Sequence, residues 1–398
     1  MHLKVIASIT LIIWLLGGTG YAQPCESYLN ELQSDYYHKH PNRKFYLHRE
    51  VDRVALADVI EEWNGSWLRL FFDESDFWKM YDSLGVDSFE SKMFVYFKER
   101  CQLFFGDSTG YDTTFSLKNI PIGSLPNYSV QASTEVLEDC HVVLFNIDAL
   151  IGASEFAKLL ILANSDKNGN IVFGEHKIKL HGKNTACIEN RLNRILTHFV
   201  DSTELPEPLL LDCQPLLLRD ITYGSNFFFL AHEYSHIILR HDPENASRSK
   251  VWQQELDADL LGMKMYLAAL IRETNSGIYN PNYMFAAPSA ALGLLCMVEN
   301  EIGLKKRSKS YSIDSFVVDE KKMFNAFQKL VKFEGDHYWV SAELDSCILD
   351  EKFDYPPAKL RLAYLYILLE LLYPQNKTLP FVKSGLKNLE MLWARKIE

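Results

Sequence analysis

The chain has 398 residues, of which 47% are hydrophobic and 13% aromatic, so it can build one large hydrophobic core or two modest ones. Its formal net charge of −11 at pH 7 is spread along the sequence rather than gathered in a tail, which argues against nucleic acid as a partner. The sequence contains neither an internal repeat nor a low-complexity tract.

Residues 1–22 have the pattern of a secretory signal peptide. Lys4 supplies a basic start, residues 5–16 form a short apolar core, and Gly20-Tyr21-Ala22 supplies small residues before the expected cleavage site at Gln23. The alternative is an uncleaved anchor, but the apolar run is short for a membrane span of about 20 residues. No other stretch reaches that length, so we expect a secreted or periplasmic protein without an integral membrane segment after cleavage.

Seven cysteines are present, and none forms a C-x-x-C pair, so a zinc site built from cysteines is not expected. Export would place the chain where disulfides can form. Because seven is odd, at least one thiol stays free or pairs with another chain.

Residues 23–130 form a mixed, aromatic-rich region whose role the sequence does not indicate. Apolar residues have helical spacing over 54–63 and 88–105. Residues 106–129 are rich in Gly, Pro, Ser, Thr and Asn, and we expect them to form a loop. We place a domain boundary at the end of this loop, with a second domain over 131–398.

After this boundary the pattern predicts a small β-sheet followed by helices. Residues 136–147 and 171–180 have the composition of strands. From residue 195 onward the apolar spacing is mainly helical. Helices are expected at 224–241, 250–271, 284–302, 320–333, 356–373 and 380–395. The expected fold is α+β and mainly helical, with a small sheet before the helix that carries the strongest motif.

Residues 164–175 match part of a calcium-binding loop, with Asn164 in place of the usual first Asp. However, a strand is expected after this segment, where a calcium loop of that type has a helix. The dipeptide Asn168-Gly169 is also a strong signal for a hairpin turn. We therefore favour a hairpin, and Ca²⁺ binding is the alternative.

The strongest chemical signal is His232-Glu233-Tyr234-Ser235-His236, inside an apolar run over 227–241. Residues four apart on a helix share a face, so His232 and His236 can bind one metal ion, with Glu233 beside it. The alternative is a surface helix that carries two histidines. The surrounding phenylalanines disfavour it, because buried imidazoles and carboxylates require partners or a metal. Glu255 lies 19 positions after His236 and offers a third ligand.

These motifs resemble those of the gluzincins, zinc peptidases with two His ligands and one Glu ligand. The short step from His236 to Glu255 is similar to that of thermolysin-like members. The local residues, H-E-x-x-H-x-x-x-x-H over 232–241 and E-x-x-A-D over 255–259, resemble the HtpX-like and BepA-like group. That group often carries H-P-P-x-x-x-R further on, and here Tyr355 precedes Pro356-Pro357 and Arg361. The resemblance implies a zincin-like metallopeptidase domain.

The resemblance also implies a role for each site residue. One Zn²⁺ per chain would be held by His232, His236 and Glu255, with Glu233 as the general base. Asp259 would orient His232 behind the metal. Tyr355 and Arg361 would stabilise the developing oxyanion; the alternative is a helix that begins at the prolines and an arginine that only binds a carboxylate. His241 is not expected on the ligand face, and we expect it to interact with the helix C-terminus.

The expected function is an exported zinc metallopeptidase, an endopeptidase, that hydrolyses a peptide or protein substrate through a metal-activated water. One alternative is a catalytically silent, zinc-stabilised binding or scaffolding protein on the same fold. The presence of Glu233 disfavours it, because a structural site needs no base. Another alternative is metal-dependent hydrolysis of a non-peptide amide. The sequence does not indicate the oligomeric state.

Overall fold

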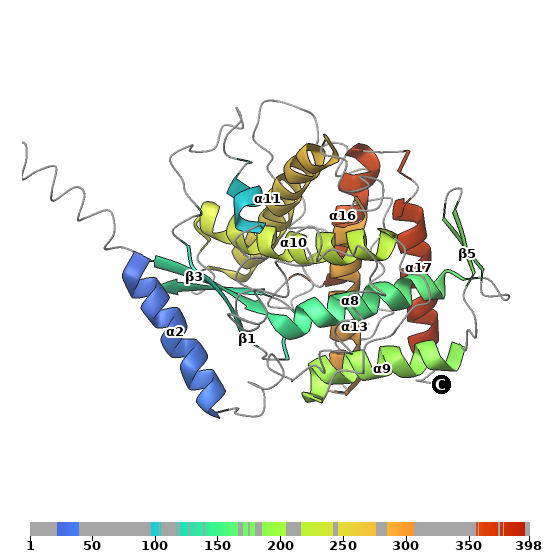
Figure 1. Ribbon diagram of the computed structural model, residues 1–398, viewed down its shortest axis with the longest axis horizontal. Coiled ribbons are helices and arrows are strands. Elements are labelled where there is room, and N and C mark those ends of the chain that lie inside the picture. The colour runs from blue at the N-terminus through green and yellow to red at the C-terminus, as the bar shows by residue number, and fades with distance from the viewer. Residues whose placement is uncertain are drawn as a thin grey trace, which may run out of the picture.

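The structure is a computed structural model, and it describes residues 22–39, 97–104, 117–165, 170–203, 216–241, 246–275, 285–305, 356–372 and 375–394, with short gaps inside some of these ranges. The helices are α2 (Ala22–Lys39), α8 (Ile147–Ala163), α9 (Thr185–Asp201), α10 (Leu216–Ile238), α11 (Arg248–Asn275), α13 (Ala287–Lys305), α16 (Ala358–Leu372) and α17 (Thr378–Ala394). The strands are β1 (Ile122–Leu125), β2 (Ser133–Leu137), β3 (Cys140–Asn146), β4 (Asn170–Phe173) and β5 (His176–Lys179). The expectation of a mainly helical α+β fold with a small sheet before α10 is confirmed (Figure 1).

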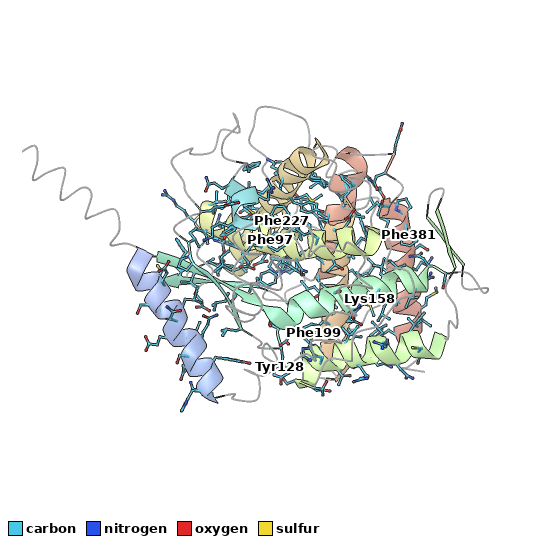
Figure 2. All side chains as sticks on the ribbon, viewed as in Figure 1. Phe97, Tyr128, Lys158, Phe199, Phe227 and Phe381 are labelled. Carbon is cyan, nitrogen blue, oxygen red and sulfur yellow. The ribbon has the colours of Figure 1, made fainter. Side chains whose placement is uncertain are left out.

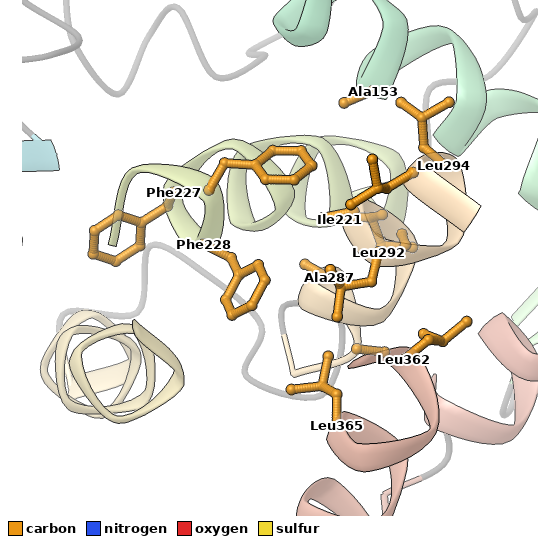
Figure 3. Close-up of a cluster of buried hydrophobic side chains, with 14 of the residues drawn as sticks. Ala153, Ile221, Phe227, Phe228, Ala287, Leu292, Leu294, Leu362 and Leu365 are labelled. Atoms are coloured by element: carbon orange, nitrogen blue, oxygen red, sulfur yellow. The ribbon is translucent and has the colours of Figure 1, made fainter. Parts of the chain in front are cut away.

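Helix α10 lies at the centre of the packing, against α8, α11 and α13. Its apolar side chains meet those of α8, α13 and α16, as Figure 3 shows for Phe228, Ala287 and Leu365. On another side Phe97 stacks on Phe227, with ring centroids 5.4 Å apart (Figure 2). Burying one such side chain contributes about 1.5–3 kcal/mol, so the helix that carries the motif is held firmly from several directions.

The three-stranded sheet has the order β1-β3-β2, with β1 parallel and β2 antiparallel to β3. The single strand expected over 136–147 is therefore a pair of strands, β2 and β3. The loop expected over 106–129 contains β1, which lies before the expected domain boundary and pairs with β3 after it. Glycine and serine in β1 mask its strand character, and its pairing with a distant segment decides its conformation.

Helix α2 packs on this sheet through Leu29, which contacts the buried cluster that includes Leu125, Val142 and Leu144. Cys25 in α2 is buried and disulfide-bonded. Residues 1–21 of the expected signal peptide lie outside the described residues. Within the described part of the chain, no helix has the length and apolar character needed to cross a membrane.

Five of the expected helices correspond to α10, α11, α13, α16 and α17, whereas those expected at 54–63 and 320–333 lie outside the described residues. Helix α8 was not expected, and α9 begins ten residues before the expected start of the helical region. Helix α8 contacts α9, α10 and α17, so it is apolar on most of its faces and has little amphipathic periodicity. A buried ion pair between Glu155 and Lys158, with N–O distance 2.6 Å, interrupts its apolar pattern.

The second expected strand, over 171–180, is also a hairpin, formed by β4 and β5. Strand β4 ends at Phe173 and β5 begins at His176, so Asn168-Gly169 does not lie between the two strands, and α8 rather than a strand precedes that dipeptide. Residues 166–169 of the expected calcium loop lie outside the described residues, and β4 follows them where a calcium loop of that type has a helix.

Candidate metal centre

His232, His236 and Glu255 come together between α10 and α11. The Nε2 atoms of the two histidines are 3.0 Å apart. The carboxylate oxygens of Glu255 lie 3.5 Å from Nε2 of His232 and 3.6 Å from Nε2 of His236. The three ligand atoms all lie within 4.8 Å of one another, and among the described residues they form the one such group of three or more His, Cys, Asp or Glu side chains. This group could hold a metal ion.

Asp259 lies one helical turn beyond Glu255 and contacts the first histidine. Its Oδ1 is 2.9 Å from Nδ1 of His232, on the opposite side of the ring from Glu255. A hydrogen on Nδ1 is thereby held on the Asp259 side, and Nε2 faces Glu255 and His236, where it can offer its lone pair to a metal ion once its own hydrogen is displaced. The structure thus places Asp259 where it can orient His232.

Arg361 is buried behind Asp259 and does not line the cleft. Its Nε and Nη2 donate to the two oxygens of Asp259 at 2.8 and 2.7 Å, and its Nη1 lies 3.3 Å from Glu255. The backbone N–H of Ala358, the first residue of α16, donates to Glu299 at 2.8 Å, and this contact anchors the helix that carries Arg361. The contacts match the carboxylate-binding alternative for Arg361 rather than an oxyanion donor. Tyr355 lies outside the described residues.

The buried charges give the two histidines different proton affinities. Burial lowers the pKa of His232, but its hydrogen bonds to Asp259 and Glu255 outweigh burial and raise that pKa to about 9. Burial and the charge of His232 lower the pKa of His236 to about 3. Without a metal, both ring nitrogens of His232 therefore carry a hydrogen near neutral pH, and a metal ion must displace the one on Nε2.

The two carboxylates that contact His232 remain ionised. Burial alone would raise the pKa of Glu255, but the hydrogen bond to His232 and the charge of Arg361 lower it to about 2. In the same way, Arg361 and His232 overcome burial and hold the pKa of Asp259 well below its usual range. Both groups are negative at neutral pH, so Glu255 can supply a negatively charged ligand to a metal ion, while Asp259 faces the buried cation Arg361.

Glu233 is buried beside the three ligands, and a residue of the sheet holds it in place. The hydroxyl of Thr134 in β2 donates to Oε2 of Glu233 at 2.9 Å. Burial raises the pKa of Glu233, against the opposing effects of His232 and of this hydrogen bond. Sequence reasoning missed Thr134, because only the pairing of distant segments brings β2 to α10.

The site opens into a cleft of about 230 Å³. It is lined by Ala132, Ser133, Thr134, Val136 and His141 of the sheet region, by His232, Glu233, His236, Ile237 and His241 of α10 and its end, and by Val251, Gln254 and Glu255 of α11. Two atoms among these are buried and have no hydrogen-bond partner among the described residues, Oε1 of Gln254 and Nδ1 of His141. Buried polar atoms usually have partners, so these two are exceptions in the wall of the cleft. No motif in the sequence marks either residue.

The expectation for His241 is not met. Arg240 adopts the left-handed conformation, with φ of 54°, and turns the chain back at the end of α10. As a result, Nδ1 of His241 lies 2.8 Å from Nδ1 of His236. His241 therefore contacts a candidate ligand and also lines the cleft.

Comparison of the chain with protein-family models, with curated proteins and with solved structures gave no significant match. The interpretation of the site therefore depends on its own donor chemistry. Two imidazoles and one carboxylate, with room in the cleft for a further ligand, are a donor set that zinc accepts in catalytic sites.

Proposed function

We propose that the chain is an exported zinc metallopeptidase with a zincin-like domain. The observation that carries this proposal is the convergence of His232, His236 and Glu255 at the base of an open cleft, with Glu233 beside them. A purely structural zinc site usually fills all four positions with protein ligands, whereas a catalytic site leaves one for water or substrate. Three ligands in a cleft support the catalytic alternative.

Zinc at this site would supply the Lewis acidity that activates water and polarises a carbonyl group. Glu233 would take a proton from the attacking water and pass it to the leaving amine nitrogen. The raised pKa of Glu233 brings it closer to neutrality, where a side chain can both accept and return a proton. Thr134 would keep the carboxylate in place, and Asp259 would keep Nε2 of His232 available.

The strand β2 supports a peptide as the substrate. Its consecutive residues Ser133 and Thr134 both line the cleft, although alternate side chains point to opposite faces of a sheet. The cleft is thus bordered by the edge of the strand, and in the described part of the chain β3 is the strand that pairs with β2. An extended peptide could hydrogen-bond along the other edge. Because β2 continues past Thr134 to Val136, which is 58% exposed, such a chain could extend beyond the site, and we propose endopeptidase action.

Two features support export. The first 22 residues have the signal-peptide pattern, and Cys25 forms a disulfide, a bond that is rare in reducing compartments. Purification of the native chain from the medium or the periplasm of its source cells, with its N-terminus at Gln23, would test the compartment.

The function is tested by comparing the wild-type protein with Glu233→Gln. We expect about one zinc per wild-type chain and cleavage of a peptide library, and we expect the variant to keep its zinc and lose cleavage. Glu370→Gln, at an exposed glutamate of α16, is the matched control and should keep both properties. One zinc per chain without any cleavage would favour the scaffolding alternative, and full activity of Glu233→Gln would refute the mechanism.

A further inference from the structure

The end of α10 forms a recognisable C-terminal motif. The backbone N–H of His241 donates to the carbonyl of His236 at 3.0 Å, and that of Arg240 donates to Ile237 at 3.1 Å. This pair of bonds, with a left-handed residue between helix and loop, is the Schellman arrangement. In this arrangement the residues at the positions of His236 and His241 usually touch through apolar side chains. Here the two residues that touch are histidines.

Arg240 occupies the position that is usually glycine. A side chain in the left-handed conformation costs roughly 1–2 kcal/mol, so the surrounding contacts must stabilise this turn. The contact that the turn creates is the one between the two imidazoles.

The distance between Nδ1 of His236 and Nδ1 of His241 limits which of the two ring nitrogens can carry a hydrogen. Two ring nitrogens 2.8 Å apart form a hydrogen bond only if one carries a hydrogen and the other offers its lone pair. If Nε2 of His236 uses its lone pair for a metal, the ring hydrogen is on Nδ1, so His236 is the donor. Nδ1 of His241 is then the acceptor, and its own ring hydrogen is on Nε2.

We propose that His241 is a positioning residue for the metal site. Its Nδ1 accepts the Nδ1 hydrogen of His236 and so holds Nε2 of His236 toward the metal. This inference rests on the proposed zinc site. Each histidine ligand then has one acceptor behind it: an ionised carboxylate, Asp259, behind His232, and a neutral ring, His241, behind His236. Neither histidine depends on solvent for its orientation.

The test measures zinc affinity by competition with a chelator, for wild type and for three variants at position 241. His241→Ala removes the acceptor. His241→Asn places an amide oxygen near the position of Nδ1, whereas His241→Gln places its oxygen one bond further out. We expect a 10–100-fold loss of zinc affinity in the alanine and glutamine variants, as is typical for loss of such a partner, and recovery to within about threefold in the asparagine variant.

Two further measurements separate positioning from folding. Thermal unfolding in EDTA reports the stability of each metal-free variant. Arg240→Gly keeps the left-handed turn without its steric cost, so it should bind zinc as tightly as wild type. In zinc-loaded wild type, nitrogen NMR of the histidines should show His236 protonated at Nδ1.

These measurements separate three claims: the positioning role of His241, the metal site and the peptidase function. Unchanged affinity in His241→Ala, or equal losses in the alanine and asparagine variants, would overturn the positioning role. A wild-type protein that binds no zinc would overturn the metal site and this inference with it. A wild-type protein that binds zinc but cleaves no peptide would overturn the peptidase function only, and the affinities of the variants would still decide the role of His241.

Discussion

The buried pair of Arg361 and Asp259 allows a direct test of the charges around the site. Arg361→Met removes the guanidinium and keeps much of the side-chain volume, so Asp259 stays buried with less compensation. The two groups share two hydrogen bonds of 2.7 and 2.8 Å. A unit pair about 4 Å apart interacts by about 4 kcal/mol at an effective dielectric constant of about 20. Breaking a buried pair on one side typically costs about 3–5 kcal/mol, and we expect the metal-free variant to lose that much stability.

The matched control is Lys383→Met, which also removes a cation that faces a carboxylate. Lys383 pairs with Glu370, but their side chains are 34% and 49% exposed. Solvent screens such pairs, and their contribution is about 0.2–1 kcal/mol. Urea unfolding in EDTA, with the midpoint and slope compared for each variant, measures both losses.

A double variant of Arg361 and Asp259 tests whether the two side chains act as a pair. Arg361→Met combined with Asp259→Leu removes both charges of this pair, so part of the lost stability should return, while the hydrogen bond between His232 and Asp259 is lost as well. If Arg361→Met alone costs no more than Lys383→Met, the network of buried charges described for the site is wrong.

Three further predictions concern binding and turnover. Zinc must displace a proton from His232, whose pKa is raised to about 9 by hydrogen bonds that include the one to Asp259. Zinc affinity should therefore rise about tenfold per pH unit from pH 7 to about 9 and then level off, and Asp259→Asn should flatten this rise. Competition with a chelator across this pH range measures both effects. Thr134→Val removes a hydrogen bond that lowers the pKa of Glu233, so the acidic limb of the pH–rate profile should move to higher pH. The loss of one hydrogen bond, roughly 1.4 kcal/mol, should also lower kcat about tenfold. An acidic limb that does not move would contradict this contact. Gln254 lines the cleft, and Gln254→Met keeps the length of its side chain without the polar atoms, so this variant should raise KM with little change in kcat. A variant with unchanged KM would show that Gln254 does not bind substrate.

The grouping of the candidate ligands could be predicted from the sequence because helical geometry is local. The spacing between His232 and His236 places both on one face, and the spacing between Glu255 and Asp259 does the same on the second helix. The apolar surroundings of the first motif also predicted that α10 is buried. Each of these inferences needs only the repeat of one helix.

The residues that sequence reasoning missed depend on contacts between distant segments or on one unusual turn. Thr134 reaches Glu233 only because β2 lies against α10. His241 reaches His236 because a non-glycine residue, Arg240, adopts the left-handed conformation, and arginine gives no signal for it. Arg361 was expected near the site, but only the packing of α16 shows that it faces Asp259 and not the cleft.

The distance in sequence between the two motifs is similar to one branch of the gluzincins, while the local residues resemble another. In the structure, a close contact between α10 and α11 lies next to the residues of both motifs. Gly262 lies two turns beyond Glu255, and a Cβ built on it would be 2.9 Å from the backbone nitrogen of His232. This close approach of backbones determines which turn of α11 faces which turn of α10: Glu255 lies near both histidines, and Asp259 lies near His232 alone.

A longer connection between the helices could leave this contact unchanged, because loop length adds only about 0.6 kcal/mol of closure entropy for each doubling. The spacing from Glu255 through Asp259 to Gly262 therefore joins a candidate ligand, a carboxylate that contacts His232 and a close approach of the two helix backbones on one helical face.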